Sequence, residues 1–247
     1  MSNSSPGRLL GSGKDADVFE FGEKVVKLYK TGTSKHAPFR EAAALALAES
    51  QGLPVPAASG VRQIDGRWGI VMARIDGPSF ADSIARQPAD AAALLAKMAA
   101  VHARIHGSRA VHLGSLKTRL AANLHLAPLL TDRQRSTLLE KLASLPDGDC
   151  LCHGDFHPWN ILGSLSQPAV VDWTSASRGE PAADVCRSYV LMKPSMPDLA
   201  TAYVDAYVRR GDSTSERIFI WLPVVAAARL AENVPDEVDG LMAMIGG

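Results

Sequence analysis

The most informative stretch of this sequence carries carboxylate and amide side chains between apolar residues. Residues 152–162 read CHGDFHPWNIL, and residues 170–173 read VVDW. Three acceptor side chains, those of Asp155, Asn160 and Asp172, therefore lie in or beside apolar runs typical of short strands. A carboxylate in such surroundings costs free energy unless it is paired, hydrogen-bonded or bound to a metal. The segment therefore predicts a functional site.

Glycine and proline shape the first part of this segment. Gly154 and Pro158 disfavour a helix, so we expect Asp155 and Asn160 to lie on a loop whose conformation these two residues define. Oxygen side chains of this kind suit a hard cation such as magnesium, with one carboxylate left as a separate base. The alternative interpretation makes Asp155 and Asn160 ordinary turn and cap residues.

The spacing of these residues resembles that of a known enzyme family. Residues 153–160 read HGDFHPWN, and Asp172 follows Asn160 by about a dozen residues. This pattern resembles the catalytic and metal-binding segments of aminoglycoside phosphotransferases and choline-kinase-like enzymes, which are distant relatives of protein kinases. The resemblance implies a phosphotransferase that uses ATP and magnesium and has an alcohol group as acceptor. It also implies that Asp155 is the catalytic base, and that Asn160 and Asp172 hold the magnesium ions that bridge the ATP phosphates. Both spacings match together, which argues against ordinary turn residues.

The first part of the chain has the pattern of short strands. Residues 8–75 contain β-rich runs separated by turns, and the last two runs are joined at Asp65-Gly66. One interruption, over residues 37–51, is rich in alanine and leucine and predicts a helix. Together with the resemblance, this pattern predicts a small β-rich N-lobe with one helix over residues 1–75, which binds the nucleotide.

The second part of the chain is predicted to be mainly helical. Apolar positions repeat with a helical period over residues 88–106 and 131–145, and helices resume near Ala182. Two short strands are expected over residues 150–172. By the resemblance, residues 76–247 form a larger C-lobe that is catalytic and binds the substrate. The predicted fold class is therefore α+β, a two-lobed fold of the protein-kinase type.

A glycine-rich stretch precedes the predicted strand at residues 18–21. Residues 10–16 read LGSGKDA, and Gly11, Ser12 and Gly13 are candidate cofactor-binding residues. A Walker A motif is excluded because its four-residue gap and the Ser/Thr after Lys are missing. A dinucleotide fingerprint requires a helix next, and here a strand follows. Strand, glycine turn and strand resemble the kinase loop whose backbone amides cover the phosphates, although a plain hairpin turn would look the same.

A lysine and a glutamate extend the nucleotide-binding prediction. Lys27 lies in a β-rich run over residues 25–29, where an ordinary lysine would be an edge or solvent-facing residue. The resemblance implies that Lys27 grips the α- and β-phosphates of ATP and pairs with Glu41 on the next helix. Lys24 and Lys30 are competing candidates for the same role.

Two further segments resemble parts of the same family. Residues 72–77 resemble the hinge between the lobes, where the adenine edge would bond the carbonyl of Ala73 and the amide of Ile75. Asp184 resembles a residue that caps a helix and hydrogen-bonds back to the catalytic loop. That role is structural, so Asp184 is not counted as a ligand.

Zinc is the competing interpretation of the cysteines and histidines. Its ligands would be Cys150, Cys152, His153 and His157. Successive residues on a strand point to opposite faces, so these four would not converge evenly on one ion, and an aspartate among them suits magnesium better. We therefore expect His153 to brace the loop and His157 to be bracing or exposed. His102 and His106 lie four apart on a predicted helix, and we favour a structural role for both.

Composition restricts the class of protein. The chain has 247 residues, of which 47% are hydrophobic, and its 26 Lys+Arg residues balance its 26 Asp+Glu residues. This neutrality offers no electrostatic case for nucleic acid or an anionic membrane as partner. Three cysteines, the polar residues 1–8 and the lack of any long apolar run predict free thiols in a cytoplasmic protein.

The expected partner is a small hydroxylated substrate, with an aminoglycoside as one candidate. Four acidic residues close to one another, with no lysine or arginine among them, would suit a polycation: Glu232, Asp236, Glu237 and Asp239. A solvated helix end is the alternative. Two other functions stay open, a catalytically silent nucleotide-binding protein and a kinase-fold nucleotidyl transferase. The sequence makes no prediction of the oligomeric state.

Overall fold

The computed structural model describes residues 5–246, and it divides into two compact units. The first unit holds the described residues up to Phe80 together with Asn160–Ser175. The second unit holds Ala81–Trp159 and the described residues from Ala176 onward. Residues 1–4 of the polar N-terminal segment lie outside the described residues. The return of Asn160–Ser175 to the first unit is a tertiary feature that the order of the chain does not indicate.

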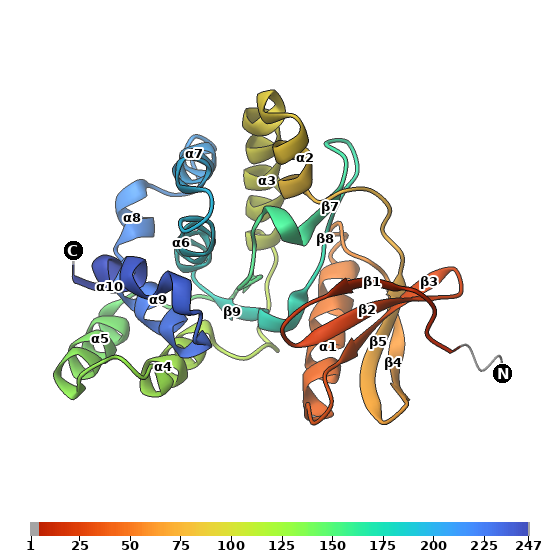
Figure 1. Cartoon of the computed structure of the whole chain (residues 1–247). Coiled ribbons are helices and arrows are strands. Elements are labelled where there is room, and N and C mark those ends of the chain that lie inside the picture. The colour runs from red at the N-terminus through yellow and green to blue at the C-terminus, as the bar shows by residue number, and fades with distance from the viewer. Residues whose placement is uncertain (1–4, 247) are drawn as a thin grey trace. The chain divides into compact units, whose positions relative to one another are not determined.

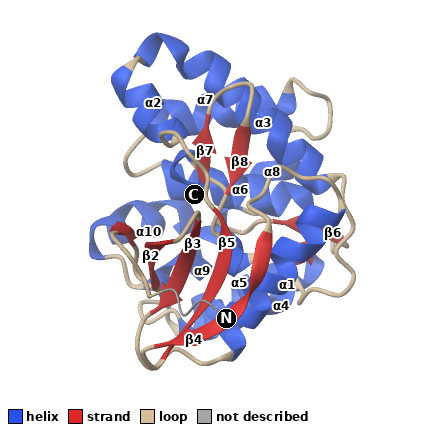
Figure 2. Ribbon diagram, turned by 90° about the vertical axis from the view of Figure 1, so that its right-hand side faces the viewer, coloured by secondary structure: helices blue, strands red, loops and turns tan. Residues whose placement is uncertain are grey.

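An antiparallel five-stranded sheet forms most of the first unit (Figure 2). Its strands, in spatial order, are β1 (Leu9–Ser12), β2 (Ala16–Phe21), β3 (Lys24–Tyr29), β5 (Arg67–Ala73) and β4 (Ala58–Ile64). The central strands β3 and β5 are the most buried because they have a neighbour on both sides. Asp65 and Gly66 both have positive φ angles, as the tight β4–β5 hairpin requires.

One helix and one hairpin complete the first unit. Helix α1 (His36–Ser50) packs against β4 and β5 and against the short 3₁₀ helix η3 (Trp173–Ser175). Strands β7 (Ile161–Gly163) and β8 (Pro168–Val170) form a hairpin, and the Val170 amide donates to the Pro54 carbonyl. This hairpin connects the two segments that carry Asn160 and Asp172.

The second unit is mainly helical (Figure 1). Its helices are α2 (Phe80–Arg86, which starts at the unit boundary), α3 (Ala91–His106), α4 (Leu116–Leu126), α5 (Asp132–Ser144), α6 (Pro181–Met192), α7 (Pro197–Val208), α8 (Ser215–Phe219), α9 (Leu222–Arg229) and α10 (Val238–Gly246). Helix α3 packs on α7, α6 on α7 and α9, and α9 on α10. A short ladder pairs β6 (Cys150–Cys152) with β9 (Ser177–Gly179).

The predicted α+β class is confirmed, with differences in detail. The helix expected over residues 37–51 is α1, and the one over 131–145 is α5, which begins with a capping box of Thr131 and Gln134. Three short strands, not two, lie within residues 150–172. Helix α4 was not predicted, although its buried leucines recur every four residues. No helix among residues 5–246 is long and apolar enough to cross a membrane.

The β6–β9 ladder predicts a cost for any side chain at Gly148. A Cβ atom there would lie 2.4 Å from the Gly179 carbonyl oxygen, so the backbone would have to shift. We expect Gly148→Ala to lower the free energy of unfolding by about 1–3 kcal/mol in urea denaturation. Gly114→Ala is the control, because its Cβ would meet nothing within 4 Å. Equal stability of the two variants would contradict the close approach.

Candidate functional site

A buried ion pair lies at the centre of the first unit. Lys27 on β3 is 8% exposed, and its Nζ lies 2.9 Å from Glu41 Oε1 and 2.8 Å from Asp172 Oδ1. Burial lowers the pKa of the Lys27 ammonium, but the charges of Glu41 and Asp172 outweigh this and hold the pKa above its usual value. The expected pairing of Lys27 with Glu41 is therefore present, and Lys27 stays a cation.

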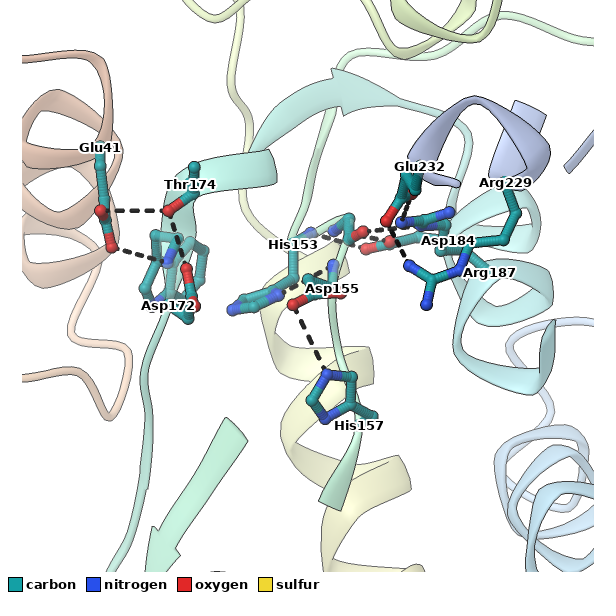
Figure 3. Close-up of polar contacts among 12 residues, drawn as sticks. Glu41, His153, Asp155, His157, Asp172, Thr174, Asp184, Arg187, Arg229 and Glu232 are labelled. Carbon is teal, nitrogen blue, oxygen red and sulfur yellow. Dashed lines mark hydrogen bonds and ion pairs between the residues drawn. The ribbon is translucent and has the colours of Figure 1, made fainter. Parts of the chain in front are cut away.

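Glu41 is surrounded by donors. Its carboxylate is 1% exposed and accepts hydrogen bonds from Lys27, from the Trp173 amide and from the Tyr29 hydroxyl. The Thr174 hydroxyl lies 3.1 Å from Glu41 Oε2 and 2.7 Å from Asp172 Oδ1 (Figure 3). Sequence reasoning missed Tyr29 and Thr174. The only signal for Thr174 was its place directly after Asp172-Trp173.

Asp172 has a strained backbone. Its φ is +63°, in the left-handed region that non-glycine residues rarely adopt. Such conformations cost on the order of 1–3 kcal/mol and cluster at functional sites. The side chain is 41% exposed although its oxygen pairs with buried Lys27. Next to it, the Val171 amide donates to the Asn160 carbonyl over 2.9 Å. The fold thus brings the backbone of Asn160 next to the segment that carries Asp172.

The competing lysines have other partners. Lys30 Nζ lies 2.5 Å from Asp17 Oδ1, and Lys24 Nζ donates to the Ser59 hydroxyl over 2.6 Å. Neither contact involves Glu41, so among the three candidate lysines Lys27 is the one that the structure pairs with the helix glutamate. This geometry favours Lys27.

The glycine-rich stretch forms the turn between β1 and β2. Gly11 and Ser12 end β1 and Gly13 follows, all exposed. The Ser12 hydroxyl donates to Asp17 over 2.7 Å. No helix follows, which agrees with the exclusion of a dinucleotide fingerprint. The predicted hinge residues Ala73 and Ile75 lie at and just after the end of β5, and the Ala73 amide already donates to the Ala57 carbonyl.

The second unit carries the predicted base on the loop between β6 and the 3₁₀ helix η2 (Pro158–Asn160). The Asp155 side chain is 28% exposed, and its Oδ2 lies 3.5 Å from His157 Nε2. Its backbone amide donates to Nδ1 of buried His153 over 3.2 Å. Burial raises the pKa of the Asp155 carboxyl, but His157, Arg187 and His153 outweigh it and hold the pKa below the usual range. Asp155 is therefore ionised at neutral pH.

Asp184 on α6 holds this loop. Its carboxylate accepts from the His153 amide over 2.6 Å and from the Gly154 amide over 2.8 Å. The predicted hydrogen bond back to the loop is confirmed. The predicted capping role is wrong, because Asp184 lies inside the first turn of α6 and Glu180 is the N-cap residue.

The C-terminal acidic residues are not free of basic neighbours. Arg187 Nε donates to the Gly154 carbonyl over 3.0 Å, and its Nη2 lies 2.5 Å from Glu232 Oε1. Arg229 pairs with the same glutamate and binds Glu237 through two nitrogens, at 2.7 and 2.8 Å. The interpretation of Glu232 and Glu237 as carboxylates without cationic neighbours is therefore wrong. No local pattern indicated Arg187, because it lies 45 residues away from Glu232 in the chain.

The zinc interpretation has no support among the described residues. Cys150, Cys152 and Cys186 are free thiols, as expected. Within residues 5–246, the cluster whose possible ligand atoms lie within 4.8 Å of one another contains instead His102, His106 and Asp184.

Comparisons with known proteins agree with this architecture. The model of the phosphotransferase enzyme family matches residues 6–219. A thermostable mutant of aminoglycoside phosphotransferase APH(4)-Ia superposes with a TM-score of 0.71 at 17% identity, over 98% of this chain and 91% of that one. Choline kinase LicA from Streptococcus pneumoniae gives a TM-score of 0.68 at 16% identity, over 98% and 92%.

A ligand-bound structure has the same fold. The streptomycin-ATP-APH(2")-IIa ternary complex gives a TM-score of 0.67 at 17% identity, over 99% of this chain and 94% of that one. A search of the curated proteins found no match. At these identities the solved structures establish the two-lobed protein-kinase-like fold and nothing finer. The match to the family model is a separate finding, and it covers most of the chain.

The contacts of Thr174 predict a specific stability effect. Thr174→Val removes a hydroxyl that lies within hydrogen-bond distance of the Glu41 and Asp172 carboxylates and accepts from Lys27, and it keeps the side-chain volume. We expect it to lower the free energy of unfolding by about 1–2 kcal/mol in urea denaturation. Thr174→Ser keeps the hydroxyl and should lie closer to the wild type. Thr174→Val as stable as Thr174→Ser would show that the hydroxyl does not stabilise Glu41.

Proposed function

The chain belongs to the phosphotransferase enzyme family, and from that premise we propose that it transfers the terminal phosphoryl group of ATP to a hydroxyl group of a small molecule. The Lys27–Glu41–Asp172 arrangement is the observation that carries this proposal. It holds a buried cation, Lys27, next to a partly exposed carboxylate, Asp172. A cation suits the phosphates of a nucleotide, and a carboxylate suits the metal ion that accompanies them.

Lys27 binds the α- and β-phosphates, and Glu41 holds the ammonium in place. Asp172 and Asn160 are the proposed magnesium ligands, and their carboxylate and amide oxygens fit a hard cation. When bound, magnesium neutralises phosphate charge. Gly11, Ser12 and Gly13 lie over the phosphates through their backbone amides. The Ala73 carbonyl and the Ile75 amide bind the adenine edge.

Asp155 accepts the proton of the substrate hydroxyl. The hydroxyl oxygen forms a bond to the γ-phosphorus while the bond from that phosphorus to the bridging oxygen of ADP breaks. Asp155 is ionised at neutral pH, so its carboxylate can orient the hydroxyl and accept the proton as the oxygen bonds to phosphorus and becomes more acidic. His157, at 3.5 Å, orients the carboxylate.

The charges of the second unit favour a substrate that is not a polycation. Glu232 and Glu237 are paired with arginines, so their carboxylates are not available to bind ammonium groups without breaking those pairs. Within residues 5–246, neither Asp236 nor Asp239, the other two acids of the cluster, forms an ion pair. We therefore favour a neutral or singly charged alcohol, and an aminoglycoside is the second candidate because solved structures of this fold include a streptomycin complex.

The direct test is the product formed from ATP and a panel of sugars, amino alcohols and aminoglycosides. We expect a neutral or singly charged alcohol to gain the mass of one phosphoryl group, and Asp155→Asn to lose about 10²–10⁴-fold in kcat. Gain of a nucleotidyl mass would instead identify a nucleotidyl transferase. Asp155→Asn with wild-type turnover would reject the base assignment, and ATP binding without any product would favour a silent nucleotide-binding protein.

Nucleotide binding tests the lysine assignment separately. Lys27→Ala should abolish most of the thermal stabilisation by Mg-ATP, because it removes the cation proposed to bind the phosphates. Lys30→Ala is the matched control on the same sheet, since Lys30 pairs with Asp17. The readout is the shift in Tm with and without Mg-ATP for each variant. A full shift in Lys27→Ala, or its loss in Lys30→Ala alone, would contradict the assignment.

A further inference from the structure

A buried polar network lies beneath the Asp155 loop within the second unit. It consists of two histidines on α3, one aspartate on α6 and two tyrosines on α7: His102, His106, Asp184, Tyr203 and Tyr207. All five residues are at most 6% exposed. Buried polar groups are costly unless hydrogen-bonded, so the pattern of hydrogen bonds defines what this network does.

The two histidines converge on one carboxylate. His102 Nε2 lies 3.0 Å and His106 Nε2 3.3 Å from Asp184 Oδ2. On the other side of each ring, His102 Nδ1 lies 2.5 Å from the Tyr203 hydroxyl and His106 Nδ1 lies 2.8 Å from that of Tyr207. The His106 bond to Asp184 is the longer one, so His106 is the weaker donor.

The direction of each hydrogen bond follows from charge. An ionised carboxylate only accepts, so each histidine donates its Nε2–H, and each Nδ1 then accepts from a tyrosine. Burial lowers the pKa of His102 to about 3, which keeps this ring neutral. Burial raises the pKa of Asp184, but its hydrogen bonds from His102 and His106 outweigh this and hold the pKa below the usual value. The Asp184 carboxylate therefore fixes the tautomer of each histidine, and each tyrosine hydroxyl donates to the Nδ1 atom that this tautomer leaves as an acceptor.

The network reaches both neighbours of Asp155. On one side, Asp184 accepts from the Gly154 amide over 2.8 Å. On the other side, the His102 ring stacks on Phe156 with centroids 4.0 Å apart. Loss of the His102 side chain would leave the buried Asp184 carboxylate with one donor fewer and would remove the ring that stacks on Phe156, so the loop around Asp155 would lose two supports.

We propose that His102, whose ring is held between Asp184 and the Tyr203 hydroxyl, is a positioning residue that holds the Asp155 loop through Asp184 and Phe156. His106 and Tyr207 form a weaker parallel arm. The proposal rests on the proposed function in one respect, that Asp155 is the base. The attachment of the loop itself does not depend on any substrate.

A metal ion is the competing occupant of this cluster. Both Asp184 oxygens already accept backbone amides, and both Nδ1 atoms have a tyrosine partner. A divalent cation would compete with these bonds and, next to a single carboxylate, leave net positive charge in a fully buried site. The hydrogen-bonded network satisfies the same groups without that cost.

Variants of His102 and Tyr203 separate the role of the hydrogen-bond donor from that of the imidazole ring. His102→Leu removes the donor, whereas His102→Gln can place an amide nitrogen near the position of Nε2. Tyr203→Phe keeps every ring and removes only the hydroxyl that donates to His102 Nδ1. We expect kcat to fall about tenfold or more in His102→Leu and less in His102→Gln, since small displacements of a catalytic group can cost up to about 100-fold. The KM for ATP should stay within about twofold. Tyr203→Phe should lower kcat less than His102→Leu does. His106→Leu should also lower kcat less than His102→Leu.

Hydrogen exchange of the His153 and Gly154 amides provides a readout without substrate. We expect exchange in His102→Leu at least about tenfold faster than in His102→Gln, after both are compared at equal global stability. If the wild type transfers no phosphate, this measurement still tests the network while the proposed function fails. Equal exchange and equal kcat in the two variants would overturn the proposal. A stoichiometric metal ion that is present in the wild type and lost in His102→Gln would also overturn it.

Discussion

Each unit is organised around a carboxylate that burial alone would destabilise. Glu41 in the first unit and Asp184 in the second are each 1% exposed, and both are surrounded by donors. A buried charge is tolerated only when partners satisfy it, and such networks then restrict the surrounding structure to a few arrangements. Around Glu41 the donors come from β3, which supplies Lys27 and Tyr29, and from Trp173 after β8. Satisfying one carboxylate therefore fixes segments that are far apart in the sequence.

The same requirement positions two residues that stay partly exposed, Asp172 and Asp155. Lys27 bridges buried Glu41 and partly exposed Asp172, and Asp172 has a strained backbone. In the second unit, Asp184 binds the two amides that precede Asp155, and Arg187 binds the Gly154 carbonyl. In both units a rigid, buried acceptor or donor holds a neighbouring residue that stays accessible. Preorganised groups of this kind lose little entropy when a ligand binds or a charge develops.

Charge pairing inside the second unit bears on the choice of substrate. Glu232 and Glu237 form ion pairs with Arg187 and Arg229, and the arginine side chains are only 11% and 13% exposed. Removing one partner of such a pair leaves a charge without compensation, so these glutamates stabilise the unit itself. A count of acidic residues along the chain therefore overstates the negative charge available to a cationic ligand.

The sequence by itself determined the class of fold and the identity of most candidate residues. Hydrophobic period and turn residues are local, which is why the strands around Lys27 and helix α1 could be predicted, as could the loop that carries Asp155. Helix α4 and the third short strand were missed because their signals are short, and tertiary packing stabilises them. Only the tertiary structure decided which donors meet which carboxylates. Thr174 beside Glu41, Arg187 beside Glu232 and the tyrosines behind His102 and His106 are separated from their partners by long stretches of chain. No local pattern encodes such contacts, because they form only when packing brings distant segments together and burial makes each unsatisfied polar group costly.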